Sequence, residues 1–577
     1  MSCSGRKQDS CWQYFEKSTV PGKSGSRATC KSCNKEMQGL VVRMKVHLAQ
    51  CIGLGQKQSS VVNPKSTDPT MPPDGIVNKL KRTFSQVDEV NLSVPSASFQ
   101  SPAKKLKTTS LSSYLYTTTE DEKKALDIQV ATMMYATNTP FNWIDHPQVK
   151  KVFSMLRPGY SPPSRHEVST RLLDEIHAGA YALCKEKVED KHVSMELDGW
   201  SNRRNEPVIC SSITTYDGDT FLTSTIDTQD ERHTGENLEA IAESAIKHAE
   251  EVLGCHIDSV VTDNAANMKK CRGLLEESHE VITYPCGAHM CNSLAKEVDN
   301  DMVKSDIVDI TKYFRNHHVP NALYKKHGGK NLSLPNDTRW NSVNDCLQAY
   351  VDNWPVLVNV VEAHREKLDT AICDKVMDMN LKRQAVEYLS KMKPIAVALD
   401  RLQADNCHLA DAVVIWKDLA ERFEDMPLAD CKKLDSRMAI ALTPAHFLAY
   451  LLDPRFLNST LLTPEEVNMA MDFASEHSPS ALPSVINYRA KSKPFGAYMF
   501  TLEVLKNTDP LAWWKSQSSM LDKNILSLVE QLFTARASTA GIERIFSTFG
   551  LVHSKLCNRL QTEKAGKLVF LYKLLNM

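Results

Sequence analysis

Long apolar runs are missing from this chain of 577 residues. None approaches the ~20 residues that a membrane-spanning helix needs, so we expect no membrane span. The first residues, MSCSGRKQDSCW, contain no apolar segment of the kind that marks a secretory signal, so the sequence predicts a protein that is not secreted. Its 16 cysteines are therefore expected to be reduced thiols, some of them metal ligands, rather than disulfides.

The chain also has almost no net charge, at −1, but its charges are unevenly distributed. Residues 1–118 hold 17 Lys and Arg against 7 Asp and Glu, a net charge of +10, which leaves −11 for the rest. A basic arm on a neutral or acidic body favours contact with nucleic acid through that arm. A solvated basic tail is the alternative.

Composition and periodicity divide the chain into six segments. Residues 56–118 are rich in Ser, Thr and Pro, and they predict a disordered basic linker because they cannot bury enough apolar surface to fold alone. Helical spacing of apolar residues predicts helices in 119–190. In 191–300, three β-rich runs at 192–201, 207–218 and 220–228 predict strands, followed by one helix between Thr234 and Gly254 and a fourth strand at 258–264. The other three segments are residues 1–55, a mainly helical block at 301–505 and a helical end at 506–577.

A set of cysteine and histidine residues near the start predicts a zinc site. The spacing C-x2-C-x13-H-x3-C gives three thiolates and one imidazole, a closed tetrahedral set suited to structural zinc, from Cys30, Cys33, His47 and Cys51. A small unit of this size should unfold without its metal. Basic residues surround these ligands and are candidates for contacts with DNA phosphates: Arg27, Lys31, Lys35, Arg43 and Lys45. A zinc knuckle that binds protein is the alternative.

Three carboxylates lie in contexts that suit catalysis. Asp198 and Asp263 each follow an apolar, β-rich run, so each side chain is expected to project from a strand end, and Glu543 lies in a predicted helix. Three acidic groups brought together can hold two divalent cations about 4 Å apart, which activate water and stabilise a leaving oxygen in phosphodiester chemistry. Taken singly, each residue would be interpreted as a strand-end cap or a solvated helix residue.

In order and context these carboxylates resemble those of the hAT family of DNA transposases. Residues 1–55 resemble the BED-type zinc finger, a DNA-binding module that often precedes such cores. The resemblance implies a multidomain α/β protein in which a ribonuclease H-like core is interrupted by the helical insertion at 301–505 and followed by a helical C-terminal dimerisation region. It also implies that Asp198, Asp263 and Glu543 bind Mg²⁺ or Mn²⁺.

Two further motifs match the same family. Cys286, His289 and Cys291 resemble its CxxH motif, which implies that His289 lies near the active site; we expect a structural role for the two cysteines, with a second zinc site as the alternative. Arg339-Trp340 resembles an element whose Trp contacts DNA, although a packed Trp beside a surface Arg would have the same sequence.

The C-terminal part also resembles the family. Trp513-Trp514 and Asn558-Arg559-Leu560 fit the dimerisation region. The chain departs from the family pattern at Gly541-Ile542, where small polar residues are common, and at Cys557, where a basic residue is common.

These features predict a nuclear protein that binds double-stranded DNA, self-associates as a dimer or higher oligomer, and cleaves and joins DNA as a hAT transposase does. Two basic clusters, Lys79–Arg82 and Lys104–Lys107, fit nuclear import signals, with ordinary solvated charge as the alternative. A domesticated transposase that regulates transcription or chromatin without catalysis is the second hypothesis. A protein-binding scaffold is the third.

Overall fold

The computed structural model describes residues 15–18, 27–31, 36–38, 118–201, 206–228, 232–336, 341–552 and 560–577. By its internal contacts the chain divides into two units, Met1–Met71 and Pro72–Met577. The first unit contains an antiparallel sheet of β1 (Phe15–Ser18), β2 (Arg27–Cys30) and β3 (Glu36–Gln38), with β2 in the middle. Cys30 is buried at the end of β2, opposite Phe15 in β1.

The first described elements of the second unit are helices, where the sequence predicts them. They are α3 (Glu120–Ala136), η2 (Phe141–Asp145), α4 (Pro147–Leu156), α5 (Arg165–Ser169) and α6 (Arg171–Val188). The start of α3 follows from its sequence, because the Thr119 hydroxyl accepts a hydrogen bond from the Glu122 amide and the Glu122 carboxylate accepts one from the Thr119 amide.

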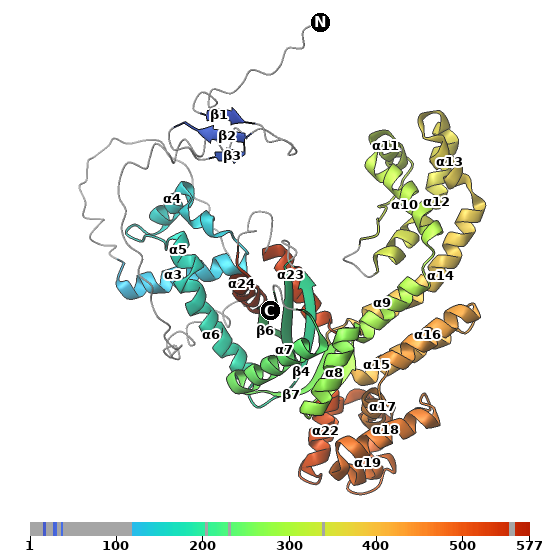
Figure 1. The fold of residues 1–577 in the computed structure, drawn as a ribbon. Helices are drawn as coiled ribbons and strands as arrows, with labels where there is room; N and C mark the ends of the chain where they lie inside the picture. The colour runs from blue at the N-terminus through green and yellow to red at the C-terminus, as the bar shows by residue number, and fades with distance from the viewer. Residues whose placement is uncertain are drawn as a thin grey trace, which may run out of the picture. The chain divides into compact units, whose positions relative to one another are not determined.

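A five-stranded sheet forms the centre of this unit (Figure 1). Its strands lie in the order β6 (Thr220–Asp227), β5 (Pro207–Thr215), β4 (His192–Ser201), β7 (His256–Thr262) and β8 (Ile282–Pro285). The strands β4, β5 and β6 are antiparallel, whereas β7 is parallel to β4 and β8 is parallel to β7. Only the short strand β8 was not expected from the sequence.

The helix expected between the third and fourth strands is also present. α7 (Gly235–His248) begins after Thr234, whose hydroxyl accepts a hydrogen bond from the Asn237 amide. It continues as the π-helical turn η3 (Ala249–Leu253) and ends at Gly254, which has a φ of +71°. α8 (Ala266–Ser278) follows β7 and packs against α7.

The two faces of β4 differ in polarity, because successive side chains of a strand point to opposite faces. Val193, Met195 and Leu197 lie in an apolar core shared with α3, α6, α7 and α8. Ser194, Glu196 and Asp198 alternate with them and are buried polar residues. These buried polar groups of β4 must be satisfied by hydrogen bonds or charge.

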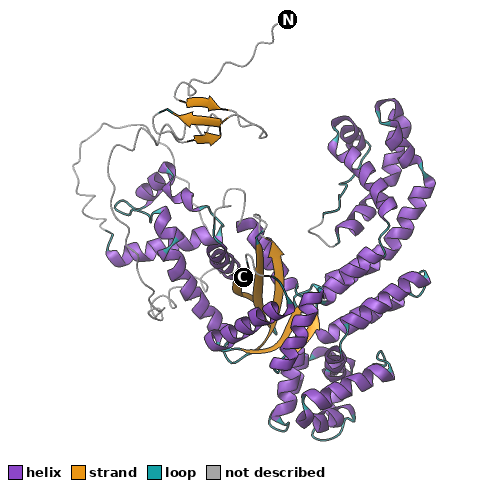
Figure 2. Ribbon diagram, in the orientation of Figure 1, coloured by secondary structure: helices purple, strands orange, loops and turns teal. Residues whose placement is uncertain are grey.

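Helices make up most of the rest (Figure 2). They are α9 (Gly287–Glu297), α10 (Asp301–Asn316), α11 (His318–Lys326), α12 (Ser342–His364), η4 (Arg365–Lys367), α13 (Thr370–Met377), α14 (Met379–Leu402), α15 (Leu409–Phe423), α16 (Leu428–Ala441), α17 (Pro444–Leu452), η5 (Pro454–Phe456), α18 (Pro464–His477), η6 (Pro479–Ala481), α19 (Leu482–Arg489), η7 (Ala497–Phe500), α20 (Leu502–Asn507), α21 (Pro510–Lys515), α22 (Lys523–Thr534), α23 (Ala540–Val552) and α24 (Thr562–Leu575). A second apolar core joins most of α9–α22 to β8.

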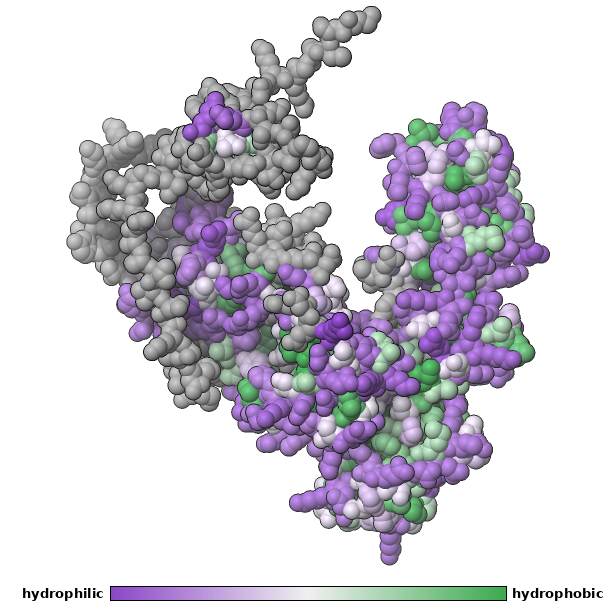
Figure 3. Space-filling model, in the orientation of Figure 1, coloured by the Kyte–Doolittle hydropathy of each residue, from purple (hydrophilic) through white to green (hydrophobic). Residues whose placement is uncertain are grey.

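The chain is thus a mixed α/β protein, mostly helical, with one five-stranded sheet in its second unit. In the face shown in Figure 3 the described residues are mainly hydrophilic, with small groups of hydrophobic ones between them. Among the described residues, no helix has both the length and the apolar character required to cross a bilayer.

Candidate metal centre

Asp198 lies within β4 and not at its end, because the strand continues to Ser201 along its antiparallel neighbour β5. The parallel neighbour β7 stops earlier, at Thr262, which pairs with Leu197. Asp198 is therefore the first β4 residue beyond the end of β7. Its side chain is only 7% exposed, and its Oδ1 accepts a hydrogen bond of 2.8 Å from the Gly199 amide.

Glu543 lies in the first turn of α23, which contacts β4, β5 and β6. The Thr539 hydroxyl, one helical turn earlier, donates a hydrogen bond of 3.4 Å to the Oε1 of Glu543. The carboxylate is 24% exposed, so it remains accessible from solvent.

His289 belongs to α9, which follows β8 directly. The Sγ of Cys286 caps this helix, since it accepts a hydrogen bond from the His289 amide. The imidazole Nδ1 lies 3.9 Å from the Oε1 of Glu543 and 3.4 Å from the Thr539 hydroxyl. The CxxH motif thus directs its histidine towards the carboxylate of a helix that begins more than 250 residues later.

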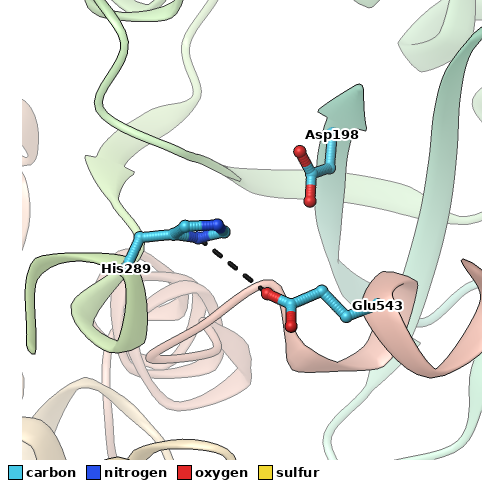
Figure 4. A group of neighbouring side chains, drawn as sticks. All are labelled: Asp198, His289 and Glu543. Carbon is cyan, nitrogen blue, oxygen red and sulfur yellow. Dashed lines mark ion pairs between the residues drawn. The ribbon is translucent and has the colours of Figure 1, made fainter. Parts of the chain in front are cut away.

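Asp198, His289 and Glu543 come together from three separate elements, with one ligand atom of each within 4.8 Å of the others (Figure 4). All three side chains point into one shared space. Two carboxylates and one imidazole form a donor set that suits Mg²⁺, Mn²⁺ or Zn²⁺. Among the described parts of the chain, this is the one group of His, Cys, Asp and Glu residues that could hold an ion.

Burial and mutual repulsion perturb the ionisation of this group. Burial, with repulsion from Asp263 and Glu196, raises the pKa of Asp198 to about 6, and burial with repulsion from Asp198 raises the pKa of Glu543 to about 8. Burial would lower the pKa of His289, but Cys286 and the two carboxylates outweigh it and raise that pKa to about 10. These shifts mark a site in which positive charge is favoured.

Asp263, the third predicted carboxylate, follows the end of β7 beside Asp198, but it is not part of the three-residue group. Its Oδ1 accepts a hydrogen bond of 3.1 Å from the Ala265 amide, which directs the carboxylate towards its own backbone before α8. Its charge still acts on the group, since it raises the pKa of Asp198.

The predicted zinc and DNA contacts lie mostly outside the described residues. Cys30 is buried and Lys31 is exposed after β2, while Arg27 begins that strand. The predicted residues outside the described ranges are Cys33, Lys35, Arg43, Lys45, His47, Cys51, Arg339 and Trp340. The zinc site and the DNA contacts therefore remain predictions from sequence.

One buried residue beside the site was not predicted from the sequence. Glu196 is 1% exposed on the polar face of β4 and raises the pKa values of both Asp198 and Glu543. The available signal was an acidic residue inside a strand, two positions before the proposed catalytic Asp198. This spacing places both side chains on the same face.

Two segments of the chain match protein families. Residues 163–313 match a domain of unknown function (DUF659) found in hAT-like transposases, and residues 497–575 match the hAT family C-terminal dimerisation region. None of the curated proteins matches the chain. The two matched segments include Asp198, His289 and Glu543, and together they support a hAT-transposase-like protein that self-associates.

Proposed function

We propose that this protein is a hAT transposase-like enzyme that cleaves and joins DNA phosphodiesters in the nucleus, with a ribonuclease H-like core built on the five-stranded sheet. The gathering of Asp198, His289 and Glu543 beside the central strand β4, where its neighbour β7 ends, carries the proposal. The sheet supports it, with three antiparallel strands followed by two parallel ones. Asp198 and Asp263 lie where β7 ends. Glu543 lies on α23, which packs against β4, β5 and β6.

Asp198, Glu543 and Asp263 would hold one or two divalent cations. To join them, Asp263 would exchange its bond with the Ala265 amide for a bond to metal. When bound, Mg²⁺ or Mn²⁺ supplies activation of water or a 3′ hydroxyl and stabilisation of the leaving oxygen. His289 fixes the Glu543 carboxylate through their contact of 3.9 Å. Thr539 orients the same carboxylate.

Cleavage is tested with purified protein, Mn²⁺ and plasmid DNA that carries the gene's own genomic flanks. We expect breaks at defined ends with the wild-type protein and none with Asp198→Asn. Asp435→Asn is the matched control, because Asp435 is exposed on α16, away from the metal-binding group. Equal cleavage by Asp198→Asn and the wild-type protein would contradict the catalytic role of this carboxylate.

A domesticated regulator that binds DNA without cutting it is the second candidate. The observation that favours it is the position of Asp263, whose carboxylate is bonded to its own backbone instead of joining the other two. Zinc-dependent binding to DNA, with no breaks at any Mn²⁺ concentration, would support this function over transposition.

DNA binding would belong to a BED-type finger held by Zn²⁺ on Cys30, Cys33, His47 and Cys51, with Arg27, Lys31, Lys35, Arg43 and Lys45 on phosphates. Arg339 and Trp340 would add contacts near the cut. We expect Cys30→Ser in the full chain to abolish the mobility shift of double-stranded DNA and to remove one bound zinc. Cys431→Ser is the control, because Cys431 lies on α16 outside the motif. Retained binding by Cys30→Ser would favour a finger that binds protein.

A further inference from the structure

Glu196 is a buried carboxylate for which the proposed chemistry has no direct use. It lies on β4 with 1% of its surface exposed. Two hydroxyls of the neighbouring strand β5 donate to it, Ser212 Oγ at 3.1 Å and Thr214 Oγ1 at 2.8 Å. The backbone amide of Ile542 donates to its Oε2 at 2.6 Å. Glu196 thus connects two strands of the sheet to a residue 346 positions away.

The partner of Glu196 is the beginning of α23. Ile542 lies in the first turn of that helix, where backbone amides have no partner within the helix and the helix dipole favours negative charge. The carboxylate supplies an acceptor at this point. A buried acid is costly unless it is hydrogen-bonded, and three donors satisfy Glu196 here.

Gly541 shows how closely the helix approaches the carboxylate. A Cβ atom added at this position would lie 2.6 Å from both oxygens of Glu196, well inside contact distance. The carboxylate could not move aside without giving up its bonds to Ser212, Thr214 or Ile542. Glycine at 541, where the hAT pattern often has a small polar residue, therefore permits this docking. Gly550, further along α23, has nothing within 4 Å of the same virtual atom.

We propose that Glu196 is a positioning residue that sets the separation of Asp198 and Glu543. Glu196 and Asp198 are two residues apart on one face of β4, about 7 Å along the strand. Glu543 directly follows Ile542, whose amide Glu196 holds. The bond from Glu196 to Ile542 therefore fixes one carboxylate relative to the other. This inference rests on the proposed metal-dependent function for its purpose, although the docking of α23 is independent of it.

Substitutions that shorten the side chain at Glu196 and enlarge the one at Gly541 test the docking of α23. Hydrogen exchange of peptides from α23 is followed by mass spectrometry in the full-length protein with Glu196→Ser, Gly541→Ala, both changes together, and Gly550→Ala as the control. We expect each single change to speed exchange in the first turn of α23 by about tenfold or more, from loss of the buried hydrogen bond or its geometry. In the Glu196→Ser background, Gly541→Ala should add nothing further. Gly541→Ala behaving like Gly550→Ala would overturn the docking.

Binding of Mn²⁺ alone, measured by electron paramagnetic resonance, separates positioning from simple support of the fold. At a temperature where the variants remain folded, we expect Glu196→Ser to weaken Mn²⁺ binding by about tenfold, the usual cost of losing a residue that orients a ligand. Glu196→Gln keeps the size and one acceptor, so it should restore both slow exchange and most of the affinity. Unchanged Mn²⁺ affinity in folded Glu196→Ser would overturn the positioning role.

The experiments distinguish failure of the proposed function from failure of the docking of α23 by Glu196. A wild-type protein that neither binds Mn²⁺ nor cuts DNA defeats the proposed function, and with it the purpose assigned to Glu196. The coupling between Gly541→Ala and Glu196→Ser in hydrogen exchange would still show whether this carboxylate docks α23 on the sheet.

Discussion

The backbone amide of Thr539 donates a hydrogen bond of 3.3 Å to the Sγ of Cys286, 253 residues away. The same sulfur accepts the His289 amide at the start of α9. One buried thiol therefore connects the residue before α23, Thr539, to the turn between β8 and α9. This arrangement favours a structural role for the first cysteine of the CxxH motif over the second zinc site.

Replacing Cys286 should therefore lower stability without changing the zinc content. We expect Cys286→Ala to leave two buried amides without an acceptor and to cost about 1–3 kcal/mol of unfolding free energy. Cys286→Ser keeps an acceptor and should cost less. Denaturant unfolding gives the stability, and elemental analysis gives the zinc. A full equivalent of zinc lost on Cys286→Ser would instead indicate a metal site.

Metal binding should release protons near neutral pH. The pKa values of about 8 for Glu543 and about 10 for His289 mean that both are protonated at pH 7, whereas Asp198, with a pKa of about 6, is mostly ionised. A divalent cation displaces the proton of Glu543, and its charge lowers the pKa of His289. We expect about one proton or more per ion at pH 7, with affinity that rises as the pH rises towards 8.

Calorimetry of Mn²⁺ binding in buffers of different ionisation enthalpy measures this proton count. Glu543→Gln should release fewer protons than the wild type. An affinity that does not change between pH 6 and pH 8 would contradict the raised pKa values of the cluster.

A histidine at the start of β4 should make stability depend on pH. His192 bonds to Asp258 of β7 through Nδ1 at 2.7 Å and to Glu530 of α22 through Nε2 at 3.1 Å. These bonds outweigh burial and raise the pKa of His192 to about 9, and the bond from His192 lowers the pKa of Glu530 to about 2. Because the folded pKa of His192 exceeds the unfolded value of about 6.5, its contribution is complete below pH 6.5 and disappears as the pH rises to about 9.

His192→Gln should accordingly cost about 1–2 kcal/mol at pH 6 and much less at pH 9.5. Glu530 contributes in the opposite direction, since its stabilisation is complete above about pH 4.5 and is lost as the pH falls to about 2. Urea unfolding at several pH values measures the difference, with exposed His166→Gln on α5 as the control. The same cost at both pH values would refute a charged His192.

The paired tryptophans of the dimerisation region should act on folding and not at the interface between copies. Trp513 and Trp514 are 1% and 0% exposed, and their indole groups donate to the carbonyls of Met499 and Leu452. We expect Trp514→Ala to cost about 3–5 kcal/mol of stability. In the same matched region, Leu502 is 65% exposed, so Leu502→Lys should keep the melting temperature and weaken self-association.

Sedimentation velocity and thermal unfolding together check this expectation. A folded monomer from Trp514→Ala, with an unchanged melting temperature, would place that tryptophan at the interface after all.

Residue chemistry and motif context are sufficient to locate much of the candidate site. Asp198, His289 and Glu543 stand out because carboxylates and a histidine follow recognisable strands or lie within motifs. The β-rich runs likewise predicted four of the five strands of the central sheet. Thr234 and Gly254 bounded the helix between them as expected.

What sequence could not supply was the set of long-range contacts that decides which groups meet. The role of Glu196 depends on hydroxyls in β5 and on an amide in α23. The need for glycine at 541 follows only from the close contact between α23 and the Glu196 carboxylate. Asp263 was expected in the cluster, but local backbone bonding near α8 directs its carboxylate elsewhere. β8 is too short, at four residues, to show a clear alternation.

The long separation between β4 and α23 has a consequence for the protein during its own synthesis. Chains emerge from the ribosome N-terminus first, so the sheet strands that end at Pro285 are complete long before Glu543 has been made. During that interval the nascent chain carries Asp198 and His289 without the third member of their group, and Glu196 lacks the backbone amide of Ile542. On the proposed mechanism, a ribosome-bound or prematurely terminated product can fold its sheet and yet hold no complete nuclease centre. If the protein cuts DNA as proposed, that activity requires almost the whole chain to have been translated.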